Sequence, residues 1–168
     1  MNKPSNHQIK TALITPEGMK MLKDELDHIW RKKRPEVTKK VSWAASLGDR
    51  SENADYQYNK KLLRAIDRRI RYLTKRIEEL RAVPYSAEQE GKVYFGAWVT
   101  IESEHGEEQK FRIVGPDEIY DRQDYISVDS PMARALLSKS IDDEAVVQAP
   151  SGEVLWFVID IRYGATDA

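Results

Sequence analysis

The sequence predicts an α+β protein, in which an N-terminal antiparallel two-helix coiled coil is followed by a small, mainly antiparallel β domain with one short helix. Two observations predict this class. Apolar residues recur at helical spacing through the first half of the 168-residue chain, whereas runs of β-branched and aromatic residues separated by turns fill the second half. Long helices followed by a series of strands give the element order of an α+β fold.

The first helix is predicted to begin after Thr15. Threonine is a good N-cap residue, and Pro16 suits the first helical position, where its missing N–H costs nothing. The apolar positions that follow at helical spacing are Leu22, Leu26 and Ile29. Pro35 lies inside the helical run and is expected to kink it or to remove one backbone hydrogen bond. Gly48 marks the predicted end of the helix.

The second helix is predicted from about residue 53 to residue 81. Its apolar residues are spaced by fours and threes, at Leu62, Ile66, Ile70, Leu73, Ile77 and Leu80. This spacing is the seam of a coiled coil. Because only a short turn joins the two helices, they are expected to pack antiparallel.

The β domain is predicted because the helical spacing of apolar residues ends before residue 91 and runs rich in β-branched and aromatic residues follow. The expected strands lie in residues 92–101, 110–115, 124–131, 144–149 and 154–163. A short helix is expected at 132–139, with Pro131 at its start. The predicted organisation is a flexible tail at 1–12, a coiled coil at 13–82 with its tip at 46–56, a linker at 83–90 and the β domain at 91–168.

Composition narrows the functional class. The chain has no Cys, which excludes disulfides and thiolate metal sites, and neither a signal peptide nor a membrane-spanning run is evident. We therefore expect a cytoplasmic protein. Residues 15–81 carry 18 Lys and Arg against 11 Asp and Glu, whereas residues 82–168 carry 7 against 17. A basic block favours an anionic partner such as nucleic acid, and an acidic block argues against one.

The stretch "SLGDRSENADY" at 46–56 admits two interpretations. Asp49 and Glu52 are three residues apart, so Asp49 could cap the second helix with Glu52 at its third position, as a capping box. The spacing alone favours this interpretation. Alternatively, both carboxylates face solvent and supply hard oxygen ligands to Mg²⁺. Two carboxylates are too few for a tight site, so the second interpretation requires a partner that brings further ligands.

The second helix also carries cations on a face away from its seam. The basic stripe, as we name it, consists of Lys61, Arg64, Arg68, Arg71 and Lys75. Lys60, Arg69 and Arg76 are expected to broaden it, and Asp67 is the only acid between residues 59 and 76. The stripe predicts salt-sensitive contacts to nucleic acid phosphates, although surface solvation is the plainer alternative. Tyr56 and Tyr58 could stack on a base or pack on the first helix.

Long motifs in both blocks resemble one family. "LGDRSENADYQYNKK" resembles the tip signature of the bacterial Gre transcript-cleavage factors, which are transcription elongation factors. "EGKVYFGAW" and "DYISVDSPMARALL" are similar to the GreB branch of that family. The resemblance runs from Leu13 to about Tyr163. It implies a coiled coil that enters the secondary channel of bacterial RNA polymerase and an FKBP-like domain that holds the channel rim.

The resemblance also implies roles for single residues. Asp49 and Glu52 match the tip acids that help to hold the second catalytic Mg²⁺ and the attacking water, a site shared with the polymerase. Ser51, Asn53 and Tyr56 would support the tip. The residues that would contact the nascent RNA 3′ end are Lys60, Lys61, Arg64, Arg68, Arg71 and Lys75. Those that would dock on the polymerase are Asp129, Ser130 and Pro131.

The implied protein is not an enzyme by itself. It would stimulate the polymerase's own endonucleolytic cleavage of RNA in backtracked complexes, as a monomer and without a tightly bound cofactor. The alternative is a regulator that occupies the same channel without causing cleavage. An autonomous nuclease is disfavoured, because no nucleophile and base can be paired and two acids are too few for a metal site.

Overall fold

The computed structural model describes residues 10–48 and 52–164, which form two compact units. Residues 19–80 form a helical hairpin, and residues 10–18 together with 81–164 form a unit built around a β-sheet. Both ends of the predicted coiled-coil domain, residues 13–18 and 81–82, therefore belong to the sheet unit. The reason is a short parallel pairing that the sequence did not indicate, between β1 (Leu13–Ile14) and β2 (Arg81–Ala82).

The first arm of the hairpin is one continuous helical path. It consists of α1 (Pro16–His28), the π-helix η1 (Ile29–Lys33) and α2 (Arg34–Ala45). The N–H of Gly18 donates to Thr15 Oγ1 at 3.0 Å, which confirms Thr15 as the N-cap. Gly48, just past the arm, has a φ of 116°, as expected for a glycine that ends a helix.

Pro35 does not end the helical path. Instead, a π-helical segment precedes it, and the N–H of Arg34 reaches the carbonyl of Ile29, five residues back. A proline ring in a regular α-helix would clash with the carbonyl four residues earlier. The wider π turn immediately before Pro35 accommodates the ring and its missing N–H.

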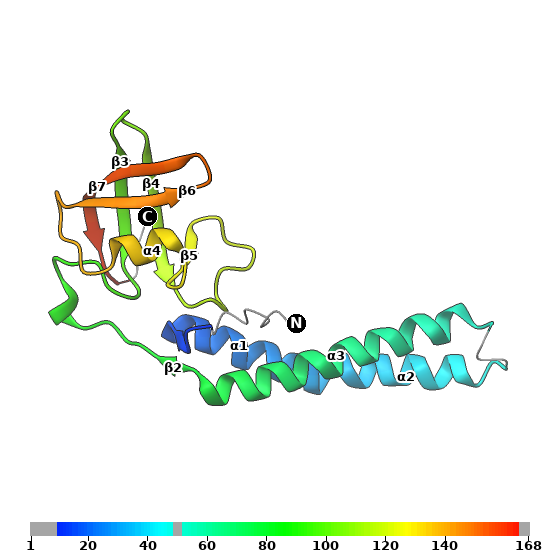
Figure 1. Ribbon diagram of the computed structural model, residues 1–168. Helices are drawn as coiled ribbons and strands as arrows, with labels where there is room; N and C mark the ends of the chain where they lie inside the picture. Colours follow the sequence, from blue (N-terminus) through cyan, green and yellow to red (C-terminus); the bar gives the residue numbers. More distant parts are fainter. Residues whose placement is uncertain (1–9, 49–51, 165–168) are drawn as a thin grey trace, which may run out of the picture. The chain divides into compact units, whose positions relative to one another are not determined.

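The second arm, α3 (Ala54–Glu79), runs beside the first in the opposite direction, as Figure 1 shows. Its predicted seam is confirmed, because Ile66 and Leu73 are buried and Leu73 has no exposed surface. Facing residues of the first arm, including Ile29 and Val37, are buried as well. Each such side chain contributes about 1.5–3 kcal/mol when fully removed from water, so the seam is what keeps the arms together.

The main sheet of this unit has five strands in the order β5-β4-β3-β7-β6 (Figure 1). Their bounds are Trp98–Ser103 for β3, Glu108–Val114 for β4, Tyr125–Ser127 for β5, Glu144–Ala149 for β6 and Gly152–Arg162 for β7. All neighbours pair antiparallel except β4 and β5. The one short helix, α4 (Pro131–Leu136), adds Ala133 and Leu136 to the hydrophobic core of the sheet. The α+β fold class is thus confirmed.

Some local predictions were wrong. The first strand of the sheet begins at Trp98 rather than residue 92, because Gly96 with a φ of 89° forms a turn before it. The linker contains a single 3₁₀ turn, Ala87–Gln89, closed by a capping box from Ser86. The predicted tail lies largely outside the described residues, but Thr11 within it is bonded to Asp129. Within the described part of the chain, no helix is long and apolar enough to cross a membrane.

Candidate functional site

The tip of the hairpin is organised by Asn53, which is the N-cap of α3. Its Oδ1 accepts the backbone N–H of Tyr56 at 3.0 Å, and its Nδ2 donates to the carbonyl of Ala44 at 2.7 Å. One side chain therefore caps α3 and ties it to the end of α2. The capping box predicted from Asp49 and Glu52 is wrong, because Glu52 precedes the N-cap instead of lying three positions inside the helix.

Glu52 is left exposed at the tip. No hydrogen bond or ion pair joins its carboxylate to another described residue. Asp49 and Ser51, also assigned to the tip by resemblance, lie outside the described residues. Among the described residues no group of three or more His, Cys, Asp or Glu could hold a metal ion. The shared Mg²⁺ site therefore stays a prediction, with Glu52 not engaged in capping the helix.

The two tyrosines near the tip have different environments. Tyr56 is 7% exposed, so its ring belongs to the interior of the hairpin. The ammonium of Lys60 lies 5.3 Å from the centre of that ring, a cation–π distance. Tyr58 is 67% exposed. The buried Tyr56 is thus placed to support the tip, and of the two tyrosines only Tyr58 is exposed enough to stack on a base.

The basic stripe is solvent-exposed along its whole length. None of its five residues forms an ion pair with another described residue. Near the tip the stripe borders a hollow of about 400 Å³, which is lined by Gln57, Lys60, Lys61, Arg64 and Arg68. Four cations around one hollow raise the local positive potential and favour a polyanion there. The RNA contact itself stays a prediction.

The acids of the hairpin are used elsewhere. Asp67 accepts from Arg34 Nε at 2.8 Å, so the one acid in this part of α3 faces the first arm and does not neutralise the stripe. Arg69 is bound by both oxygens of Glu25, at 3.1 and 2.8 Å. Arg76, only 8% exposed, lies 3.6 Å from Glu79. The sequence suggested that Arg69 and Arg76 broaden the stripe. In the structure they form ion pairs with Glu25 and Glu79 instead.

The loop assigned to polymerase docking has structural roles in the sheet unit. Asp129 accepts the backbone N–H of Thr11 at 2.9 Å and also its hydroxyl. Ser130 is the N-cap of α4 and accepts the N–H of Ala133 at 3.2 Å. Pro131, at the first turn of α4, is exposed. Of the three residues, Pro131 is the one whose side chain has the most surface to offer a partner.

Comparison with known proteins gives matches over both units. Residues 12–81 match the family described as "Transcription elongation factor, N-terminal", and residues 88–163 match "Transcription elongation factor, GreA/GreB, C-term". The transcription elongation factor GreB of Pseudomonas putida is 69% identical over 93% of this chain and 96% of its own. That of Vibrio cholerae is 64% identical over 92% of this chain and 97% of its own.

Solved structures of related factors also align with the chain. The GreA factor homolog 1 (Gfh1) of Thermus thermophilus is 25% identical and covers 90% of this chain and 98% of its own, with a TM-score of 0.39. A GreA/GreB factor from Nitrosomonas europaea is 15% identical, covers 90% of this chain and 98% of its own, and has a TM-score of 0.42. These TM-scores are too low to support an argument, so the relationship rests on the sequence matches.

Proposed function

The chain belongs to the GreA/GreB family of transcription elongation factors, and from this premise we propose that it enters the secondary channel of bacterial RNA polymerase and stimulates cleavage of backtracked RNA. The cleavage would be the polymerase's own endonucleolytic reaction near the RNA 3′ end, and it would release the arrested enzyme. The protein would act as a cofactor of that reaction without a complete active site of its own.

The observation that carries the proposal is the exposed carboxylate of Glu52, which has no hydrogen bond or ion pair with another described residue. It lies directly before the N-cap at the closed end of a long hairpin, while Asn53 does the capping. A carboxylate held at the end of a rigid rod can be delivered into a narrow site on another protein. Its partner in this role would be Asp49, from the same turn.

The chemistry of the tip fits a hard cation. Carboxylate oxygens are the donors that Mg²⁺ prefers, and one or two of them suffice when other molecules complete the shell. Bound between Asp49, Glu52 and polymerase ligands, Mg²⁺ would lower the pKa of the attacking water and neutralise charge on the phosphate. The residues of this chain would orient that shared site, and Asn53 would keep the turn in register.

The basic stripe would hold the extruded RNA beside the hairpin. Its cations have no acidic partner among the described residues, so their charge is available to phosphates. Changing Lys61, Arg64 and Arg68 together to Glu should weaken cleavage of complexes with longer extruded RNA while polymerase binding holds. Unchanged yields of long fragments would argue against this role. The docking loop at residues 129–131 would contact the channel rim through the exposed Pro131 at the start of α4.

The proposal is tested by cleavage of RNA in a defined backtracked complex. Glu52→Gln and Asp49→Asn each remove one carboxylate and should lower the cleavage rate by at least 10-fold, a loss of about 1.4 kcal/mol of transition-state stabilisation. Asp55→Asn makes the same change of charge two residues inside α3 and should cleave normally. Polymerase binding of all three variants should match that of the wild type.

Two outcomes would contradict the proposal. Near-normal cleavage by both tip variants, with binding intact, would remove the tip carboxylates from the reaction. Wild-type protein that binds polymerase but leaves backtracked RNA uncut over a range of Mg²⁺ concentrations would instead identify a regulator that occupies the channel without causing cleavage.

A further inference from the structure

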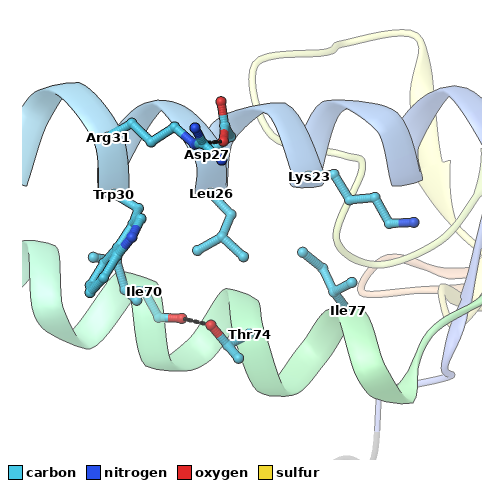
Figure 2. Close-up of a pocket in the computed structure, with 8 residues that line it drawn as sticks. All are labelled: Lys23, Leu26, Asp27, Trp30, Arg31, Ile70, Thr74 and Ile77. Carbon is cyan, nitrogen blue, oxygen red and sulfur yellow. Dashed lines mark hydrogen bonds and ion pairs between the residues drawn. The ribbon is translucent and has the colours of Figure 1, made fainter.

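A second hollow lies between the arms of the hairpin, farther from the tip. It has a volume of about 530 Å³. It is lined by Lys23, Leu26, Asp27, Trp30 and Arg31 of the first arm and by Ile70, Thr74 and Ile77 of α3. Figure 2 shows Leu26 and Trp30 pointing from the first arm toward α3. We name this hollow the Trp30 groove.

Trp30 gives the groove an aromatic wall. Its side chain is 57% exposed, although tryptophan is usually largely buried in a soluble protein. It lies in η1, and π-helical segments are frequent at functional sites. The guanidinium of Arg34 lies 5.7 Å from the ring centre on one side. The apolar floor of the groove is formed by Leu26, Ile70 and Ile77 (Figure 2).

The polar groups of the groove indicate what it could accept. Thr74 donates its hydroxyl to the carbonyl of Ile70 at 2.7 Å, so this donor is already used within α3. Asp27 is paired with Arg31 at 2.6 Å, which neutralises the one acid of the lining. Lys23 has no ion pair with another described residue. The groove is therefore apolar at its floor and positive at its rim.

The groove adjoins the basic stripe. Of the stripe residues, Arg71 lies three positions before Thr74 on α3, the spacing at which side chains of a helix are neighbours, so the stripe approaches the groove through Arg71. Lys32 and Lys33 are exposed beside Trp30 on the first arm. A polyanion that followed the stripe would thus arrive at an exposed aromatic ring and an apolar hollow. This combination of a cationic track with an aromatic platform is how proteins bind single-stranded nucleic acid without reading its sequence.

We propose that the Trp30 groove binds a base of single-stranded RNA, which stacks on Trp30 while its phosphates contact the basic stripe. The proposal rests on the proposed function for the source of the RNA, which would be the extruded 3′ segment. Ile70 lies 17 residues beyond Asn53 along α3, or roughly 25 Å at about 1.5 Å per residue. Only longer extruded segments would reach the groove, so Trp30 would favour deeply backtracked complexes.

The test measures binding of the full-length protein to a uridine dodecamer by fluorescence anisotropy at low salt, without polymerase. Trp30→Ala should weaken binding on the order of 10-fold, because stacking on an aromatic side chain supports each bound base. Trp30→Leu should be equally weak, since it restores apolar volume without a stacking face, and Trp30→Phe should regain part of the affinity. Binding of wild type should fall steeply as salt is raised.

Tyr72→Ala is the matched control. Tyr72 lies on α3 at a similar height, is 37% exposed, and has the guanidinium of Arg69 at 5.5 Å from its ring. It is not among the residues that line the groove. Its removal should leave RNA affinity unchanged. A circular dichroism melt of each variant checks that the hairpin still folds, which is expected because Trp30 is largely exposed.

The proposal is overturned if wild type binds no RNA, if Trp30→Ala binds as well as wild type, or if Trp30→Leu restores affinity. Weaker binding of Trp30→Ala to polymerase, with RNA binding unchanged, would make the groove a protein-docking site and would likewise overturn it. In each of these cases wild-type cleavage of backtracked RNA would still stand, so failure of the groove is distinct from failure of the proposed function.

Discussion

Asn53 is expected to be the residue whose loss most weakens the tip of the hairpin. Its side chain makes two hydrogen bonds, to the N–H of Tyr56 at 3.0 Å and to the carbonyl of Ala44 at 2.7 Å. Loss of an N-cap typically costs about 1 kcal/mol. The bond to Ala44 adds about 1 kcal/mol, because that carbonyl keeps a second donor, the N–H of Leu47 at 3.2 Å. Asn53→Ala should therefore destabilise the hairpin by about 2 kcal/mol.

The two bonds can be separated by substitution. Asn53→Ser keeps a capping oxygen but is too short to bridge to Ala44, so it should cost only about 1 kcal/mol. The assay is urea unfolding followed by the helical circular dichroism signal, with the midpoint compared at constant slope. Asn59→Ala is the control, because Asn59 is also on α3 and bonds only the carbonyl of Asp55, one turn back, at 2.9 Å.

The reasoning about Asn53 would be refuted if the free energy of unfolding of Asn53→Ala lay within about 0.5 kcal/mol of the wild-type value, which is the range of ordinary surface substitutions. Equal losses in the Ala and Ser variants would refute a narrower part of it. They would show that the bridge to Ala44 carries the whole effect and that capping contributes nothing.

Three further predictions concern stability. Tyr163→Phe removes a hydroxyl that donates to the carbonyl of Lys92 and should cost about 1–2 kcal/mol in urea unfolding. Burial raises the pKa of Tyr163, so the wild type should also lose stability as pH rises above about 10, and the Phe variant should lose less over the same range. Gly115→Ala would place a Cβ 2.0 Å from the carbonyl oxygen of Leu13, and because neither backbone can yield freely, a loss of at least about 2 kcal/mol is expected by the same assay. Gly48→Ala meets no atom within 4 Å but has a φ of 116°, so a smaller loss of about 1 kcal/mol is expected from strain alone, and no loss would show that the turn relaxes.

Much of the fold could be predicted because its elements have strong periodic signals. The seam of α3 is the clearest case, since Ile66 and Leu73 are buried as the four-three spacing requires. The two-residue strands β1 and β2 could not be predicted, because a pattern of period two needs more than two residues to be seen. The π turn before Pro35 was also missed, since proline signals an interruption but not the way in which a helix accommodates it.

The candidate site was less predictable because several residues at the tip could serve as the cap. Asp49, Ser51 and Asn53 are all good N-cap types, and spacing to Glu52 favoured Asp49. The choice of Asn53 depends on the carbonyl of Ala44 lying within reach of its amide, and that is a contact across the hairpin. An Asp at this position could cap α3 but could not donate to the carbonyl, so only the amide serves both arms.

The charged residues of the hairpin are also divided between two roles. Acids that face the seam or its flanks, such as Asp67 and Glu25, pair with Arg34 and Arg69 and bring the two arms together. Such half-exposed pairs contribute little stability each, about 1 kcal/mol or less. They do keep acidic side chains away from the far face of α3. The basic stripe therefore remains a continuous positive surface that ends near Glu52, whose carboxylate has no partner among the described residues. A polyanion on the stripe would lead to a carboxylate that can bind a cation.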